Sequence, residues 1–215
     1  MLKVWGRRNS QNVQKVLWLV RELGLAHEHV PAGGAFGRLS DPDFGALNPN
    51  RTVPVIEDDG VVVWESHAIL RYLAARYGGD AWWPADPAER SDFDRWLDWA
   101  QAQWQPAFLS GVFWGFYRTP EAQRDAKAIA RSLARTTELL HLVERQLQGR
   151  AYLTADHLTL GDVPLGSCLY RYFELEIERP DLPRVAAWYA RLTERPGYRE
   201  HVMLPFDDLK GRLAF

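Results

Sequence analysis

Two serines stand where a helix is expected to begin, and a hydroxyl at such a position can stabilise an anion. Ser10 opens one amphipathic helical pattern, and Ser66 opens another. Backbone N–H groups in the first turn of a helix lack intrahelical partners, and the helix dipole places partial positive charge there. Both effects favour a bound anion. Each serine is therefore a candidate anion-binding residue, although each could also serve only as the cap of its own helix.

Cysteine and histidine side chains offer little further chemistry. Cys168 is the single cysteine and has apolar neighbours, so we expect an inert core residue, no internal disulfide and a reducing compartment. His27 and His29 would share one face of a strand, but no third ligand is evident and we expect no metal site. The candidate chemistry is therefore concentrated at the two helix starts.

The elements that must position these serines alternate between strand and helix in the first part of the chain. Period-two runs and turn residues predict strands at residues 3–5, 27–30, 53–56 and 61–64. Helical spacing predicts helices from Ser10 to a C-terminal cap at Gly24, over residues 42–47, and from Ser66 to Gly78, the last with Ile69, Leu70, Leu73 and Tyr77 on its core side. The order βαβ, then αββα, predicts a thioredoxin-like α/β domain at residues 1–79.

Strand patterns disappear after this domain, and only helical patterns follow. Asp86-Pro87 predicts a helix start, with residue 106, a proline, kinking a long helix. Thr119-Pro120 should start another helix, whose apolar seam is Ile129, Leu133, Thr136, Leu140, Val143 and Leu147. A cap at residues 159–162 precedes a helix through Ile177, and Pro183 and Pro196 begin two more. The sequence thus predicts a linker at residues 79–85 and an all-α helical-bundle domain at residues 86–215.

The composition is that of a soluble globular protein. Of 215 residues, 47% are hydrophobic and 25% are charged, and the formal net charge is −2. Neither end carries a basic block, so we expect no nucleic acid and no anionic membrane as partner. The most apolar stretch, residues 106–117, is too short to span a bilayer. The first residues lead directly into a strand pattern without a signal segment, so we expect a cytoplasmic protein.

Four motifs, in order and at matching distances, resemble the cytosolic glutathione transferases over nearly the whole chain. They are S-Q-N-V-Q-K-V at residues 10–16, L-N-P-N at 47–50 followed by V-P-V-I at 53–56, W-E-S at 64–66 followed by A-I-L-R-Y-L at 68–73, and T-L-G-D at 159–162. Within that family the chain is most similar to the serine-type, theta-like bacterial group. The resemblance implies glutathione as co-substrate, no metal, and a homodimer.

The resemblance also implies roles for individual residues. Ser66 would hold the α-carboxylate of the γ-glutamyl end of glutathione, and Glu65 would accept hydrogen bonds from its ammonium group. Pro54 would be cis, which lets Val53 pair antiparallel with the cysteinyl part. Ser10 would stabilise the thiolate of glutathione through its hydroxyl. The alternative for Glu65 is a solvated acid, and the alternative for Pro54 is an ordinary edge-strand proline.

Some of the implied contacts have more than one candidate. Asn12 could donate its side-chain amide to the thiolate in place of Ser10. The family usually has a glycine and then a basic residue before the Val-Pro pair, whereas this chain has Arg51 and then Thr52. Arg51 is the first candidate for the glycyl carboxylate, and Phe36 and Arg38 in the glycine-rich loop are alternatives.

A small hydrophobic electrophile should bind beside the long helix of the second domain. Its candidate pocket residues are aromatic, namely Trp104, Phe108, Phe113, Trp114 and Tyr117. An aromatic stripe at helical spacing is often core instead. The leading hypothesis is conjugation of glutathione to this electrophile. The competing hypotheses are a non-catalytic binding or carrier protein of the same fold and another glutathione-dependent activity, such as thiol transfer, peroxide reduction or isomerisation.

Overall fold

A computed structural model describes residues 1–213 of the chain and divides them into two compact units. The first, here the N-terminal unit, contains residues 1–85 and 196–204, and the second, here the helical unit, contains residues 86–195 and 205–213. In the part of the chain described, no helix combines the length and the apolar character needed to cross a membrane.

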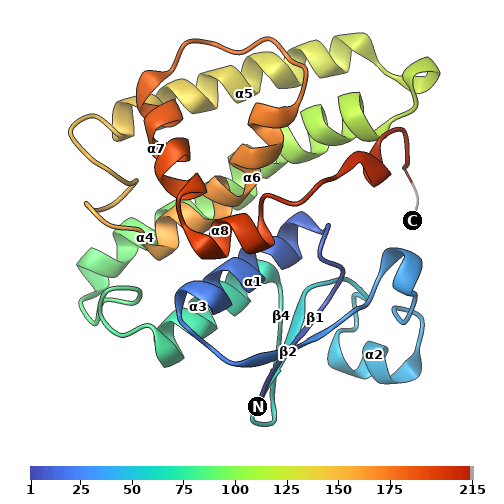
Figure 1. Cartoon of the computed structure of the whole chain (residues 1–215), viewed down its shortest axis with the longest axis vertical. Helices are drawn as coiled ribbons and strands as arrows, with labels where there is room; N and C mark the ends of the chain where they lie inside the picture. Colours follow the sequence, from blue (N-terminus) through green and yellow to red (C-terminus); the bar gives the residue numbers. More distant parts are fainter. Residues whose placement is uncertain (214–215) are drawn as a thin grey trace. The chain divides into compact units, whose positions relative to one another are not determined.

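A four-stranded mixed sheet forms the base of the N-terminal unit (Figure 1). Its strands, in the spatial order β2-β1-β3-β4, are β1 (Leu2–Trp5), β2 (His27–Val30), β3 (Val55–Asp58) and β4 (Val61–Trp64). β1 runs parallel to β2, with Leu2 opposite His27, and β3 runs antiparallel to β1 and β4. A parallel pair needs a crossover connection, which the first helix supplies. The predicted thioredoxin-like architecture is confirmed.

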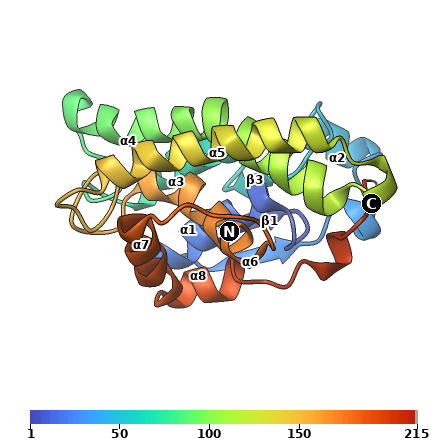
Figure 2. The same ribbon diagram turned by 90° about the horizontal axis from the view of Figure 1, so that it is seen from above.

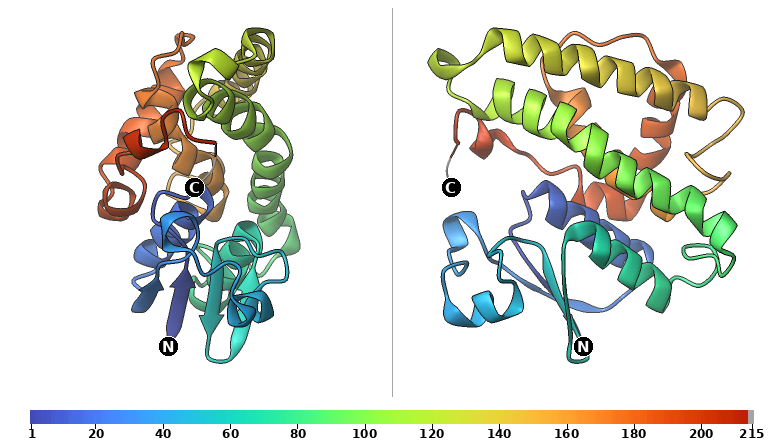
Figure 3. Two further views of the ribbon diagram at one scale, coloured as in Figure 1. Left: turned by 90° about the vertical axis from the view of Figure 1, so that its right-hand side faces the viewer. Right: turned by 180° about the vertical axis from the view of Figure 1, so that it is seen from behind.

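Helices α1 (Gln11–Glu22) and α3 (Ser66–Tyr77) lie side by side against this sheet (Figure 3). The predicted core face of α1 is confirmed, since Val13, Val16, Leu17 and Val20 are at most 1% exposed. α1 ends where Gly24 takes a positive φ of 66°, and the backbone N–H groups of residues 24 and 25 close the last turn. The unit also contains α2 (Pro42–Leu47) and the short 3-10 turn η1 (Gly34–Phe36).

Helix α8 (Pro196–His201) packs with α1 in the N-terminal unit, although the sequence pattern places it in the helical domain. The contact includes Trp18 and Tyr198, whose ring centroids are 5.0 Å apart in an edge-to-face arrangement. Both rings are fully buried. Because aromatic side chains contribute large buried areas, this pair explains why a late segment returns to the first unit.

The β3–β4 hairpin turns at Asp59 and Gly60, a residue pair that favours a two-residue turn. Asp59 and Gly60 have φ values of 48° and 88°, and positive φ at both central residues is the geometry of a two-residue hairpin turn. The prediction that Tyr77 belongs to the core of α3 is wrong, because its side chain is 38% exposed. Its hydroxyl donates to Asp58 Oδ2 at 2.7 Å, so the end of α3 is attached to the hairpin through a polar contact.

The helical unit contains no strand within its described residues and is built from long helices. They are α4 (Pro87–Trp99), the π-helical segment η2 (Ala100–Arg118), α5 (Ala126–Gln146), α6 (Val163–Glu174) and α7 (Pro183–Thr193), with short 3-10 turns η3 (Glu121–Gln123), η4 (Leu160–Asp162) and η5 (Asp207–Leu209). α5 runs alongside η2 (Figure 2). Its predicted seam is buried apart from Leu133, which is partly exposed. The predicted all-α fold of this part of the chain is confirmed.

Three helix boundaries differ from the sequence-based prediction. The long helix changes to π-helical turns at Ala100, and Pro106 lies within that segment. α5 begins at Ala126 rather than after Thr119, because Asp125 accepts from the backbone N–H of Ala128 at 2.9 Å. The hydroxyl of Thr119 instead donates to a carbonyl at the end of η2. The third difference is α6, which ends at Glu174 and not at residue 177.

A buried capping box fixes the entrance to α6, as the T-L-G-D motif predicts. The Asp162 carboxylate accepts from the backbone N–H and the hydroxyl of Thr159 and from the backbone N–H of Leu153, each at 2.9 Å. Asp162 is fully buried, and burial raises its pKa to about 6 although these hydrogen bonds lower it. A carboxylate with this many donors organises the surrounding loop as well as the helix.

Candidate active site

The loop between β1 and α1 approaches Val53 closely because residue 6 is a glycine. Gly6 has a φ of 148°, and a Cβ added there would collide with Val13 and lie 3.2 Å from the Cβ of Val53. Only a residue without a side chain permits this approach. Val53 therefore lies beside the first turn of α1, the turn that Ser10 precedes.

Ser10 occupies the N-cap position of α1 in an extended conformation, with φ −80° and ψ 123°. Its carbonyl accepts from the backbone N–H of Gln14 at 2.9 Å, but its hydroxyl makes no capping hydrogen bond. The hydroxyl is thus not engaged by the helix that it precedes. A donor beside free N–H groups and a helix dipole suits an anionic ligand atom.

Asn12 lies in the first turn of α1, two residues after Ser10. Its side-chain oxygen Oδ1 is buried and has no hydrogen-bond partner among the residues that the structure describes. A buried acceptor without a donor costs about 1–3 kcal/mol. A ligand group that donates a hydrogen bond at this helix start would remove that cost, whereas a thiolate, which only accepts, would not.

Val53 belongs to the segment just before β3. The Val53–Pro54 peptide bond is cis, as the family resemblance implies. The pairing of β3 with β1 begins at Val55, opposite Trp5, so Val53 lies beyond the end of that ladder. Its main chain is consequently at a position where an extended ligand can pair with it.

Glu65 and Ser66 form the entrance to α3. Glu65 is the N-cap residue and has a φ of 68°, which is unusual for a residue with a side chain and costs about 1–3 kcal/mol. Ser66 is the first helical residue and is 5% exposed, whereas Glu65 is exposed. Such strained conformations persist only where the surrounding fold holds them in place, and they are frequent at ligand sites.

The Arg51 guanidinium is engaged by the loop that precedes it. Its Nη1 donates to the carbonyl oxygens of Leu39 at 2.7 Å and Asp41 at 3.1 Å. Gly45 makes room for this group, since a Cβ there would lie 2.6 Å from Arg51 Nη2. Arg51 therefore holds this loop in place, and the assignment of the glycyl carboxylate to Arg51 stays a prediction.

The neighbouring candidates for that carboxylate have different surroundings. Thr52 is exposed, and its carbonyl accepts from the side-chain amide of Asn48 at 2.9 Å. The Arg38 guanidinium lies 4.8 Å from the centre of the Trp5 ring, and the side chain of Phe36 is 56% exposed. Arg38 is exposed, so its charge is at the surface.

The structure separates the five aromatic residues predicted for an electrophile pocket. Trp104 and Phe108 are fully buried and stack on each other, with ring centroids 5.1 Å apart, inside the helical core. Phe113 is 1% exposed and stacks on Tyr117 at 5.4 Å. Trp114 lies under a guanidinium, that of Arg118, at 3.7 Å. Of the five, Tyr117 alone lines the cavity described next.

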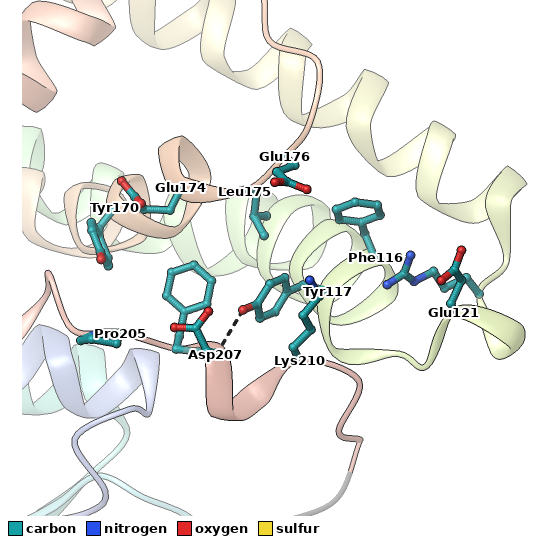
Figure 4. A pocket seen from close by; sticks show the side chains of 12 residues that line it. Phe116, Tyr117, Glu121, Tyr170, Glu174, Leu175, Glu176, Pro205, Asp207 and Lys210 are labelled. Atoms are coloured by element: carbon teal, nitrogen blue, oxygen red, sulfur yellow. Dashed lines mark hydrogen bonds between the residues drawn. The ribbon is translucent and has the colours of Figure 1, made fainter.

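A cavity of about 480 Å³ opens in the helical unit at the end of η2 (Figure 4). It is lined by residues from η2, the following turn, the end of α6 and the C-terminal segment, namely Phe116, Tyr117, Glu121, Arg124, Tyr170, Glu174, Leu175, Glu176, Pro205, Phe206, Asp207 and Lys210. The Tyr117 hydroxyl donates to the carbonyl of Phe206 at 3.5 Å, across the cavity wall. The volume of the cavity is that of an ordinary small-molecule site.

Sequence reasoning did not identify most of these cavity residues. Phe206 follows the last regular helix, where no periodicity indicates a buried side chain. Tyr170 lies on α6, whose apolar pattern indicates core packing only. The cavity residues come from three separate segments, residues 116–124, 170–176 and 205–210, so no single sequence pattern indicates that they meet.

Metal ligation has no candidate site within residues 1–213, where no three His, Cys, Asp or Glu side chains converge. His29 Nε2 lies 2.7 Å from the carbonyl oxygen of Gly6, and burial lowers the pKa of His29. Cys168 is buried with 1% exposure, as expected.

Comparison with known proteins gives matches over nearly the whole chain. The family model described as glutathione S-transferase, N-terminal domain, matches residues 1–75, and the model for the C-terminal domain matches residues 107–196. Glutathione S-transferase GstB of Escherichia coli strain K12 is 39% identical over 207 residues, which cover 95% of this chain and 99% of the relative. Glutathione S-transferase 3 of Zea mays is 30% identical over 208 residues, covering 94% and 93%.

A solved structure is also similar. It is a theta class glutathione S-transferase from Xanthomonas axonopodis pv. citri with glutathione bound, with a TM-score of 0.89 and 47% sequence identity over 95% of this chain and 98% of that chain.

Proposed function

The chain belongs to the glutathione S-transferase family and is a glutathione transferase, and we propose that its N-terminal unit holds glutathione along Val53, with the γ-glutamyl end at Glu65 and Ser66. The observation that carries this assignment is the entrance to α3, where a strained Glu65 precedes a buried Ser66 at a helix N-terminus. That arrangement provides free N–H groups for a carboxylate and an exposed acid for an ammonium group.

The chemical step requires a thiolate at the start of α1. An ordinary thiol has a pKa of about 8.5, so only a few per cent is ionised at pH 7. Lowering that pKa by about 2 units corresponds to about 2.7 kcal/mol of thiolate stabilisation. The free hydroxyl of Ser10 supplies a donor for this purpose. The side-chain N–H groups of Asn12 are the second candidate.

The glycyl end of glutathione would lie near the segment of Arg51 and Thr52. Because the Arg51 guanidinium already donates to two carbonyls, a contact with the carboxylate would use its remaining N–H groups. Arg38 is the alternative cation, and Phe36 would contribute apolar contact. We also propose two domains in the sequence, a glutathione-binding domain at residues 1–79 and an all-α domain at residues 86–215. Helix α8 lies within the second range, although it packs with α1.

The second substrate is a small hydrophobic electrophile, bound by aromatic residues of the helical unit. Tyr117 is the member of the predicted set that lines a cavity, and the Phe113 ring stacks on the Tyr117 ring. The enzyme then brings thiolate and electrophile together, and proximity provides much of the rate enhancement. Detoxification in the cytoplasm is the role that this chemistry suits.

We further propose that the chain acts as a homodimer with a two-fold axis. The edge strand β4 supports this proposal, because Val61, Val62 and Trp64 are 42%, 40% and 38% exposed. Exposed apolar side chains on an edge strand favour contact with another chain, and identical subunits commonly associate about a two-fold axis.

Calorimetric titration with glutathione tests the assignment of the site. Replacing Ser66 with Ala should weaken binding by about tenfold or more, since a charge-assisted hydrogen bond contributes about 1.5–3 kcal/mol. Ser91→Ala is the matched control, because the Ser91 hydroxyl donates to a carbonyl within α4. Equal affinity for wild type and Ser66→Ala, or no binding to wild type at millimolar glutathione, would refute the proposal and favour a non-catalytic role.

A further inference from the structure

We propose that the cavity of the helical unit binds an organic cation, that is, a quaternary or primary ammonium group attached to an aromatic or aliphatic body. The cavity lies within the helical unit, and every residue that lines it belongs to residues 116–124, 170–176 or 205–210. At about 480 Å³ it is within the range of pockets that enclose small ligands. Because Tyr117 also belongs to the proposed electrophile pocket, the inference names the chemical class of the ligand of that pocket and rests on the proposed function in this respect. It does not depend on the glutathione site.

Three aromatic rings form the inner wall of this cavity. The Tyr117 and Phe206 ring centroids are 5.0 Å apart with an interplanar angle of 68°, and those of Tyr170 and Phe206 are 5.9 Å apart with an angle of 89°. Rings that meet edge to face present their faces in different directions. The Phe206 ring already has one cation near it, since the Arg171 guanidinium lies 5.8 Å from its centre. A cation near such faces is attracted by the ring quadrupoles, and sets of aromatic rings are a general means of holding alkylammonium groups.

The charged residues that line the cavity are predominantly acidic. Glu121, Glu174, Glu176 and Asp207 supply four carboxylates, whereas Arg124 and Lys210 supply two cations. Arg124 is partly engaged already, because its Nε donates to the Thr119 carbonyl at 3.2 Å and its guanidinium lies 4.9 Å from the Phe116 ring. The cavity therefore has an excess of negative charge, which favours a cation and disfavours an anion.

The carboxylates act on the same rings that form the inner wall. The pKa of Tyr170 is raised by burial and then by Glu174 and Asp207, and the pKa of Tyr117 is raised by burial and then by Asp207 and a neighbouring aspartate. The buried guanidinium of Arg171 opposes this effect on Tyr117, but more weakly than Asp207. Negative charge and aromatic faces thus coincide at the Tyr170 side of the cavity, which is where the cationic group would lie.

The carboxylates at the rim are exposed, so their effect on binding should be moderate and dependent on salt. Glu174 and Asp207 are both exposed side chains. Exposed charges are screened within about 8–10 Å at physiological ionic strength. We therefore expect preference for the cation over an uncharged analogue of about tenfold at low salt, decreasing as salt is added.

Calorimetry without glutathione tests this inference, with benzyltrimethylammonium as the cation, benzyl alcohol as the uncharged probe and phenylacetate as the anion. The expected order of affinity is cation, uncharged probe, anion. The double substitution Glu174→Gln with Asp207→Asn should reduce affinity for the cation by about fivefold to tenfold and leave that for benzyl alcohol unchanged. Glu138→Gln is the matched control, because Glu138 is an exposed acid of α5 outside the cavity.

The ring faces are tested by a second pair of variants. Tyr170→Phe keeps the ring and should keep the affinity for benzyltrimethylammonium, whereas Tyr170→Leu should lower it several-fold. Equal affinities for the cation and phenylacetate in the wild type would overturn the proposal, as would a double substitution that changes nothing. Because glutathione is absent from these titrations, their failure would leave the glutathione titration with Ser66→Ala as an independent result.

Discussion

The two units of the chain differ in which residues take a positive φ. All four residues with a side chain and a positive φ in the described chain, Arg38, Arg51, Asp59 and Glu65, lie in the N-terminal unit. Three of them flank the proposed glutathione site. The positive-φ residues described in the helical unit are glycines, for which this conformation has no steric cost.

Buried polar groups differ between the start of α1 and the entrance to α6. Asp162 in the helical unit has donors from Thr159 and Leu153 around it, whereas Asn12 in the N-terminal unit has a buried oxygen without a partner in residues 1–213. A satisfied network stabilises a fold, and an unsatisfied group at a helix start indicates where a ligand would bind. The start of α1 thus has an unpaired buried acceptor, whereas the polar groups at the entrance to α6 are paired. Among the described residues of the helical unit, unpaired buried atoms occur elsewhere, at Trp96 Nε1, Trp104 Nε1 and Thr136 Oγ1.

The largest effect that would break this comparison is expected at Asp162. Replacing Asp162 with Ala leaves the backbone N–H groups of Thr159 and Leu153 buried without an acceptor, and should lower the free energy of unfolding by about 3–4 kcal/mol. Urea unfolding measures the loss. Asp86→Ala is the control, because Asp86 caps α4 through an exposed contact and should cost about 1 kcal/mol. Similar losses in the two variants would remove the special role of the buried network.

The pH dependence of stability should separate the units next. Burial lowers the pKa of His201 in the N-terminal unit from 6.5 to about 4. The unfolded chain then binds the proton first, so the stability that His201 provides is complete above pH 6.5 and is lost as the pH falls toward 4. Relative to wild type, His201→Leu should gain about 3 kcal/mol between pH 7 and pH 4.

Asp162 should respond in the opposite direction. Its raised pKa of about 6 means that the folded state binds the proton first, and stability from this group is lost as the pH rises from 3.8 through 6.

Unfolding curves of wild type and His201→Leu at several pH values measure the His201 contribution, because Asp162 is present in both proteins and its contribution cancels in the difference. A constant difference between the two proteins would contradict the assignment.

The proposed thiolate donor gives the third prediction. If the Ser10 hydroxyl contacts only the sulfur, as we propose, Ser10→Ala should raise the pKa of the bound glutathione thiol by about 1–2 units with little loss of affinity. Ultraviolet titration of the bound thiolate measures the shift, with Asn12→Ala as the companion variant. If Asn12→Ala alone moves the titration curve, the role belongs to Asn12, and unchanged curves for both variants would remove the helix start from the mechanism.

The smallest effect is expected at two glycines that have the same conformation in different units. Gly24 after α1 and Gly149 after α5 have φ values of 66° and 72°, and a Cβ at either position would meet no atom within 4 Å. Replacing either residue with Ala should cost about 1 kcal/mol, since only the backbone conformation opposes the change. Thermal unfolding compares them. A much larger cost at one glycine would indicate that its surroundings, and not its φ, decide the effect.

Local sequence patterns predicted the strands and most of the helices of both units, although not every boundary. The hairpin turn at residues 58–60, the cap at Gly24 and the capping box of Asp162 each depend on residues near one another in the chain. The start of α5 was wrong because two capping signals, Thr119-Pro120 and Asp125, lie six residues apart and only hydrogen-bond geometry distinguishes them.

Features that depend on distant residues were not predictable. The engagement of Arg51 by the carbonyl of Leu39 requires the path of a glycine-rich loop, and the cavity requires Tyr117, Tyr170 and Phe206 to meet from three segments. Aromatic periodicity along η2 could not distinguish the fully buried Trp104 from the accessible Tyr117. The candidate glutathione residues were identified from motifs and not from periodicity.

The most direct measurement is a crystal structure of the protein grown with glutathione. The account predicts that the cysteinyl main chain pairs with Val53, that the γ-glutamyl carboxylate accepts from the N–H or hydroxyl of Ser66, and that the sulfur lies within hydrogen-bonding distance of Ser10 or Asn12. Glutathione found elsewhere, or a γ-glutamyl group away from the entrance to α3, would contradict it.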